Sequence, residues 1–100
     1  MTPEEYVRTY YQAILDKKWD VAFKMQPAAS QQGGTVADFQ STQTGYGLTA
    51  FKVLSATATG DTTVVDVEQN LGSNGTWGVL WTFVEYNGGW VVQSRQVQMK

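Results

Sequence analysis

The spacing of apolar residues changes once along the chain, from a helical period to an alternating one. Near the N-terminus they recur as they do on one face of an α-helix, at Val7, Tyr10, Tyr11 and Ile14. From Thr49 onward apolar and polar residues alternate, which is typical of strands that bury one face of a sheet. The pattern therefore predicts an α+β fold in which N-terminal helices pack on a C-terminal sheet.

The first two helices have clear boundaries in the sequence. Thr2-Pro3-Glu4-Glu5 combines an N-cap threonine, a proline at the first helical position and a glutamate that closes a capping box. This helix is expected to run to about Asp16. A short second helix, around residues 19–23, is expected to stop at Pro27, because proline cannot continue a helix.

A third helix is predicted after a polar connector, residues 28–34, which is interpreted as flexible. Thr35 is the expected N-cap, and Val36 and Phe39 are expected to face inward. A glycine in the left-handed conformation should end this helix, at Gly45 or Gly47. Six aromatic residues of the helical half are predicted to lie in the core: Tyr6, Tyr10, Tyr11, Trp19, Phe23 and Phe39.

Turn signals divide the second half into four strands. They recur about every thirteen residues, at Gly60-Asp61, Ser73-Asn74-Gly75 and Asn87-Gly88. This spacing predicts an antiparallel meander, curved so that the helices cover one face, within a single domain of residues 1–100. The last hairpin, residues 77–99, contains three of the four tryptophans and is the expected centre of the fold.

The register of the middle hairpin has two alternatives. A two-residue turn at Asn74-Gly75 would turn Asp66 and Glu68 toward the tryptophan face, opposite Phe83 and Trp81. A three-residue turn that adds Ser73 would turn Val65 and Val67 to that face instead. Burial of two unpaired carboxylates among aromatic rings costs several kcal/mol, so the three-residue turn is favoured.

The favoured register predicts which residues share each face. The outer hairpins are expected to pair Ala56 with Val65, Phe83 with Val92, and Trp81 with Ser94. The predicted inner face is apolar and consists of Leu54, Ala56, Val65, Val67, Leu71, Trp77, Val79, Trp81, Phe83, Trp90 and Val92. The predicted outer face also carries apolar residues: Phe51, Val53, Val64, Leu80, Val84, Tyr86, Val91 and Val97. This second set suggests a homodimer that forms through the outer sheet face, or coverage by a neighbouring domain.

Composition excludes several kinds of chemistry. The chain of 100 residues has no histidine and no cysteine, which excludes histidine-based catalysis, thiolate chemistry and the usual zinc ligands. Its net charge of −2 argues against nucleic acid as a partner, and no apolar run is long enough for membrane insertion. We expect no metal and no cofactor. A polar surface rich in Thr, Gln, Ser, Asn and Gly suggests an extracytoplasmic bacterial protein, secreted or anchored as a lipoprotein.

The predicted helices and meander resemble the nuclear transport factor 2-like (cystatin-like α+β cone) superfamily. The resemblance covers nearly the whole chain, and its motifs are the opening Pro3-Glu4-Glu5 helix, Lys18-Trp19-Asp20, the alternating Thr63/Val65/Val67, and Asn87-Gly88-Gly89-Trp90-Val91-Val92. It is closest to the short extracytoplasmic bacterial members. These are packing motifs, so the resemblance implies a fold and no particular chemistry.

Polar residues at one end of the predicted inner face form a candidate ligand site. Gln69, Trp77, Trp81, Ser94 and Gln96 are the predicted ligand-binding residues, flanked by Lys52 and Gln98. Rigid aromatic rings with a few amide and hydroxyl groups suit a neutral polar ligand such as a sugar fragment or a short peptide. The other interpretation is that these groups are hydrated at the open end of the cone.

The leading functional hypothesis is a non-catalytic binding or assembly domain of the bacterial cell envelope, with no catalytic residues. The alternative is a small enzyme similar to ketosteroid isomerases or polyketide cyclases. Its general base would be Glu85, opposite Trp90, or Asp66 if the middle hairpin had the other register. A structural spacer without a pocket is the third hypothesis.

Overall fold

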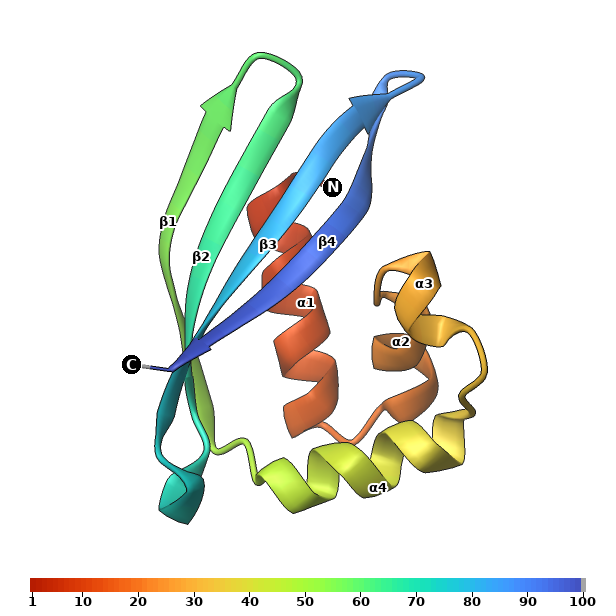
Figure 1. Ribbon diagram of the computed structural model, residues 1–100, viewed down its shortest axis with the longest axis vertical. Coiled ribbons are helices and arrows are strands. Elements are labelled where there is room, and N and C mark those ends of the chain that lie inside the picture. Colours follow the sequence, from red (N-terminus) through yellow and green to blue (C-terminus); the bar gives the residue numbers. More distant parts are fainter. Residues whose placement is uncertain (100) are drawn as a thin grey trace.

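The computed structural model describes residues 1–99. Four helices come first, followed by four antiparallel strands whose order in the sheet is their order in the chain. Figure 1 shows the strongly twisted sheet on one side of the molecule and the helices against one of its faces. The predicted α+β arrangement is therefore confirmed, with one helix more than expected.

Helix α1 (Pro3–Leu15) begins and packs as its sequence predicts. The Thr2 hydroxyl accepts a hydrogen bond from the Glu5 amide at 3.1 Å, and the Glu5 carboxylate accepts one from the Thr2 amide at 3.0 Å. This capping box satisfies two backbone donors that the first helical turn leaves free. The predicted apolar stripe is buried against the sheet at Val7, Tyr10, Tyr11 and Ile14.

The other three helices are shorter and less buried. Helix α2 (Trp19–Lys24) is followed by α3 (Ala28–Gln31), which lies in the segment predicted to be a flexible connector. That prediction was wrong because Pro27 occupies the N-cap position of α3 and leads into one further helical turn. In α4 (Val36–Tyr46) Phe39 is the only buried residue, and Val36 is exposed, contrary to prediction.

Strands β1 (Ala50–Thr59), β2 (Thr62–Asn70), β3 (Thr76–Tyr86) and β4 (Gly89–Met99) form the meander. The connection between β2 and β3 has five residues, 71–75, and contains a 3₁₀ turn at Gly72–Asn74, so neither predicted turn is correct. Val65 lies opposite Trp81. The observed register differs by two residues from the favoured one, and a shift of two keeps every side chain on its predicted face.

A β-bulge in β1 reverses part of the predicted inner face. Val53 lies opposite Val67 and Ser55 lies opposite Asp66, which leaves Leu54 as an extra residue. Residues on the N-terminal side of a bulge change faces relative to an unbroken strand. Phe51 and Val53 therefore pack against the core, whereas Leu54 is 42% exposed, the opposite of the prediction for all three.

A second bulge, in β4, changes which residues face the helices. Phe83 pairs with Val92 as predicted, but Thr82 pairs with Ser94, so Gln93 is the extra residue. The residue opposite Trp81 is therefore Arg95 instead of Ser94. Ser94 and Gln96 turn to the outer face, and Arg95 and Val97 turn to the inner one.

The apolar surface of the outer face is smaller than predicted. Phe51, Val53 and Val97 leave it because of the two bulges. The predicted apolar residues that remain there are Val64, Leu80, Val84, Tyr86 and Val91, and Leu54 joins them because the β1 bulge exposes it. Tyr86 and Val91 are the most exposed of the six. The sheet-mediated homodimer stays a prediction that rests on these six residues.

Trp81 is the centre of the core. It is fully buried, and the rings of Tyr6, Tyr10, Tyr11 and Phe83 lie with their centroids 4.8–6.4 Å from its own. Of the six aromatic residues predicted as core, four are buried, and Tyr6 and Trp19 are partly buried against the same cluster. The aromatic rings thus join the helices to the sheet.

The β1 bulge leads to a test on two neighbouring residues. Val53→Ala is expected to lower the free energy of unfolding by about 1–2 kcal/mol, because Val53 packs on the core. Leu54→Ala is the matched control and should change it by less than about 0.5 kcal/mol, because Leu54 is exposed. Urea unfolding followed by tryptophan fluorescence measures both, and a larger loss in Leu54→Ala would contradict the bulge.

Candidate functional site

A cavity of about 380 Å³ lies where the C-terminal end of α4 approaches the sheet. Because Phe39 is the only residue that α4 buries, the rest of this helix does not close on the strands. We call this cavity the α4 pocket. It is lined by Tyr46, Gln69, Leu71, Asn74, Trp77, Arg95 and Val97.

A smaller cavity of about 240 Å³ continues along α4 toward α3. It shares two lining residues, Tyr46 and Arg95, with the α4 pocket, so the two spaces adjoin. Asp38, Phe39, Thr42, Gln43 and Tyr46 line it along α4 at helical spacing. Figure 1 shows α4 running below α1 and α2, with its C-terminal end beside the lower end of the sheet.

Asn74 positions both aromatic walls of the α4 pocket. Its side-chain amide donates hydrogen bonds to the carbonyls of Gly45, at 3.2 Å, and Tyr46, at 2.9 Å. Its own carbonyl accepts a hydrogen bond from the Trp77 indole at 2.9 Å. One residue of the β2–β3 connection therefore caps α4 and orients Trp77.

Arg95 brings a positive charge to the inner face of the sheet. One of its terminal nitrogens donates a hydrogen bond to the Tyr10 hydroxyl at 2.7 Å. The guanidinium carbon lies 5.5 Å from the centre of the Tyr10 ring and 5.3 Å from that of Trp81, which are cation–π distances. Within residues 1–99 the single ion pair is Arg8–Glu4, so Arg95 contacts no carboxylate there.

The tyrosines around Arg95 do not neutralise it. Burial raises the pKa of Tyr10, and Arg95 beside it only partly opposes this effect. Burial also raises the pKa of Tyr11, whose hydroxyl accepts a hydrogen bond from the Trp81 indole at 3.1 Å. Both hydroxyls are therefore neutral at pH 7. Within residues 1–99 Arg95 forms no ion pair, although Asp38 lines the smaller cavity with it.

The structure separates the five predicted ligand-binding residues. Gln69 and Trp77 line the α4 pocket, and Trp81 is fully buried beneath it. Ser94 and Gln96 lie on the outer face, opposite Thr82 and Leu80, so their predicted place beside the tryptophans was wrong. The physical reason is the β4 bulge, which moves them to the other side of the sheet.

Sequence analysis assigned only two of the seven lining residues to a ligand site and missed Tyr46, Leu71, Asn74, Arg95 and Val97. Tyr46 could have been found, because it follows Phe39 by seven residues and thus lies on the same face of a helix. Arg95 carries no such signal. Its alternation with Ser94 and Gln96 predicts an outward side chain unless the bulge at Gln93 is known.

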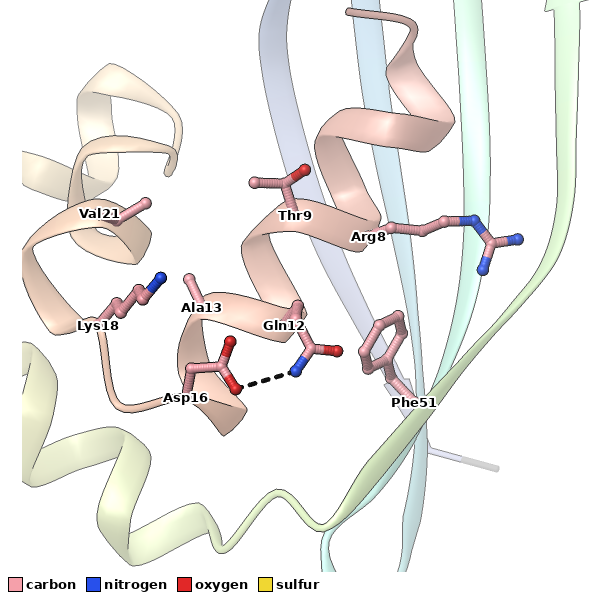
Figure 2. Close-up of a pocket in the computed structure, with 8 residues that line it drawn as sticks. All are labelled: Arg8, Thr9, Gln12, Ala13, Asp16, Lys18, Val21 and Phe51. Carbon is pink, nitrogen blue, oxygen red and sulfur yellow. Dashed lines mark hydrogen bonds between the residues drawn. The ribbon is translucent and has the colours of Figure 1, made fainter.

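A larger cavity of about 550 Å³ lies along the exposed side of α1 (Figure 2). Its lining includes Phe51, and several of its polar groups pair within or next to α1. Gln12 donates a hydrogen bond to Asp16 at 3.1 Å, as Figure 2 shows, and Arg8 pairs with Glu4 at 3.2 Å. This groove is open and its charges have both signs, so it defines a ligand less well than the α4 pocket does.

The carboxylates of the enzyme hypothesis lie outside the α4 pocket. Asp66 and Glu68 are opposite Leu80 and Gly78 on the outer face, and Glu85 is exposed near the tip of the last hairpin. The register that would bring Asp66 beside Trp81 is therefore not the one observed. Over residues 1–99, no three acidic side chains come together as a metal site would require. No helix of this part of the chain is long and apolar enough to cross a membrane.

Comparison of the chain with protein-family models, with curated proteins and with solved structures gives no match in any of the three.

Proposed function

We propose that the protein is a non-catalytic binding domain whose ligand occupies the α4 pocket. The observation that carries this proposal is a cavity of about 380 Å³ between two aromatic walls, Tyr46 and Trp77, that Asn74 holds in place. Ligand pockets commonly have volumes of about 300–1,000 Å³ and combine apolar walls with a few polar groups. The volume suits a small molecule.

The arrangement of helices over a meander supports a relationship to the nuclear transport factor 2-like superfamily, which we propose as the fold family. The cell-envelope location stays a prediction from composition. The enzyme alternative loses support, because the two carboxylates named as its base lie away from the pocket.

Two-dimensional NMR of the tryptophan indole groups tests the proposed pocket. In a screen of small organic molecules against the full chain, binders are expected to shift the Trp77 indole N–H resonance most strongly. The indoles of Trp19 and Trp90 serve as internal controls, because neither residue lines the α4 pocket. Trp77→Phe removes the reporter resonance and so assigns it. Shifts confined to Trp19 or Trp90, or no shift from any molecule, would contradict the proposal.

A further inference from the structure

The α4 pocket contains one strong indication of what its ligand is, and this inference rests on the proposed function. We propose that the ligand is a small monocarboxylate, whose carboxylate binds Arg95 and whose apolar or aromatic group lies between Tyr46 and Trp77. This differs from the neutral ligand predicted from the sequence. The reason is that Arg95, and not Ser94, faces the helices.

The first argument is the unused hydrogen-bonding capacity of Arg95. A guanidinium has five N–H donors in a planar fork that matches a carboxylate. Its one side-chain hydrogen bond within residues 1–99 is to the Tyr10 hydroxyl. The remaining donors belong to a partly buried side chain that lines both adjoining cavities. An anion in the pocket would give them an acceptor.

The second argument is the low polarity around the charge. The guanidinium lies against the rings of Tyr10 and Trp81, which displace water from one of its sides. An ionic interaction is stronger where water is excluded, so this arginine should bind an anion more tightly than an exposed one would. Tyr10 holds the guanidinium in position and reduces the entropy lost on binding.

The third argument concerns the rest of the ligand. Beyond Arg95, the lining is apolar or aromatic at Leu71, Trp77, Val97 and Tyr46. The side-chain amide of Gln69 can form a hydrogen bond with a polar atom of the ligand. An apolar group attached directly to the carboxylate would therefore contact these walls, and an aromatic ring could stack on Trp77 or Tyr46.

A phosphate fits this pocket less well than a carboxylate. Arg95 is the only cationic side chain in the described lining, whereas a phosphate monoester carries about two negative charges. Moreover, α4 presents its C-terminal end to the pocket, and the negative end of the helix dipole disfavours a dianion. The Asn74 amide donates hydrogen bonds to two of the carbonyls at that end, which weakens the repulsion of an anion. A single negative charge is then repelled less than two.

Three probes of nearly the same shape test the proposal on the unmodified chain. They are phenylacetate, its neutral analogue phenylacetamide, and phenyl phosphate, each titrated at pH 7 while the Trp77 indole and the Arg95 side-chain N–H resonances are followed. We expect phenylacetate to bind at least about tenfold more tightly than phenylacetamide, the ratio typical of a charge-assisted hydrogen bond. Added salt should weaken the binding of phenylacetate but not that of the neutral phenylacetamide.

A pair of variants then isolates the charge. Arg95→Met keeps an unbranched stem over Tyr10 and Trp81 but removes the guanidinium, and should abolish the preference for phenylacetate over phenylacetamide. Arg8→Met is the matched control, because Arg8 lines the α1 groove and no part of the α4 pocket. It should keep the wild-type preference.

The outcomes separate the two proposals. If phenylacetamide binds as tightly as phenylacetate and shifts Trp77, the carboxylate proposal is overturned and the binding function stands. If phenyl phosphate binds most tightly, the choice of carboxylate is wrong. If no probe shifts Trp77 at millimolar concentration, the carboxylate proposal fails, and the screen described above decides whether the pocket binds anything else.

Discussion

Trp81→Ala is expected to lower the free energy of unfolding by about 3–5 kcal/mol, the usual cost of deleting a large buried aromatic side chain. Trp81 is fully buried, stacks on Phe83 and has edge contacts with three tyrosines. Its loss also removes the donor to the Tyr11 hydroxyl and one of the rings beneath Arg95. Because small domains have only about 5–15 kcal/mol of stability, the variant should be close to unfolding.

Urea unfolding monitored by far-ultraviolet circular dichroism measures this effect. Trp81→Phe is the informative control. It keeps a ring in the core but leaves the Tyr11 hydroxyl without its donor, so we expect an intermediate loss of about 1–3 kcal/mol. Trp77→Ala should cost less than Trp81→Ala, because Trp77 lines a cavity and is only partly buried. Equal losses at positions 77 and 81 would show that the core is not centred on Trp81.

Alkaline pH is expected to unfold the protein through Tyr6, Tyr10 and Tyr11. Burial raises the pKa of all three hydroxyls above the ordinary value of about 10. Below that pH both folded and unfolded chains keep these protons, and the stability is fully present. As the pH rises above about 10, the unfolded chain releases protons that the folded chain retains, so stability falls. The slope is up to about 1.4 kcal/mol per pH unit for each of the buried Tyr10 and Tyr11.

Urea unfolding at pH values between 8 and 12 tests this prediction. Tyr11→Phe removes one of these three groups and should reduce the alkaline slope by about a third to a half. Phe83→Leu is the matched control, because it weakens the same core without removing a titratable group and should leave the slope unchanged. A slope that is equal in Tyr11→Phe and in the unmodified chain would assign alkaline unfolding to other groups.

Much of the fold was predictable because local chemistry determines it. Thr2 and Glu5 form a capping box from their spacing alone, and the stripe that includes Val7 and Tyr11 can be buried only as one helix face. The faces of β2 and β3 were predicted correctly although the turn was not. A register shift of two residues leaves each side chain on the same face of the sheet. Asp66 and Glu68 therefore lie on the outer face both in the predicted register and in the observed one.

The candidate site was predictable only in part. Gln69 and Trp77 could be placed from their alternation along continuous strands. Arg95 could not, because a bulge adds one residue without a distinctive sequence signal and reverses every side chain beyond it. The pocket itself depends on how far α4 stands from the sheet, and that distance results from contacts between segments remote in sequence, such as Asn74 with Gly45 and Tyr46.

The sequence by itself determined three of the four helices, the four strands, their order and the aromatic core, since caps, turns and periodicity act over a few neighbouring residues. Only the tertiary structure decided that Phe51, Val53 and Arg95 face inward while Leu54, Ser94 and Gln96 face outward. The physical reason is that bulges form where whole strands and helices must fit together, so the positions of Leu54 and Gln93 depend on the packing of the entire sheet.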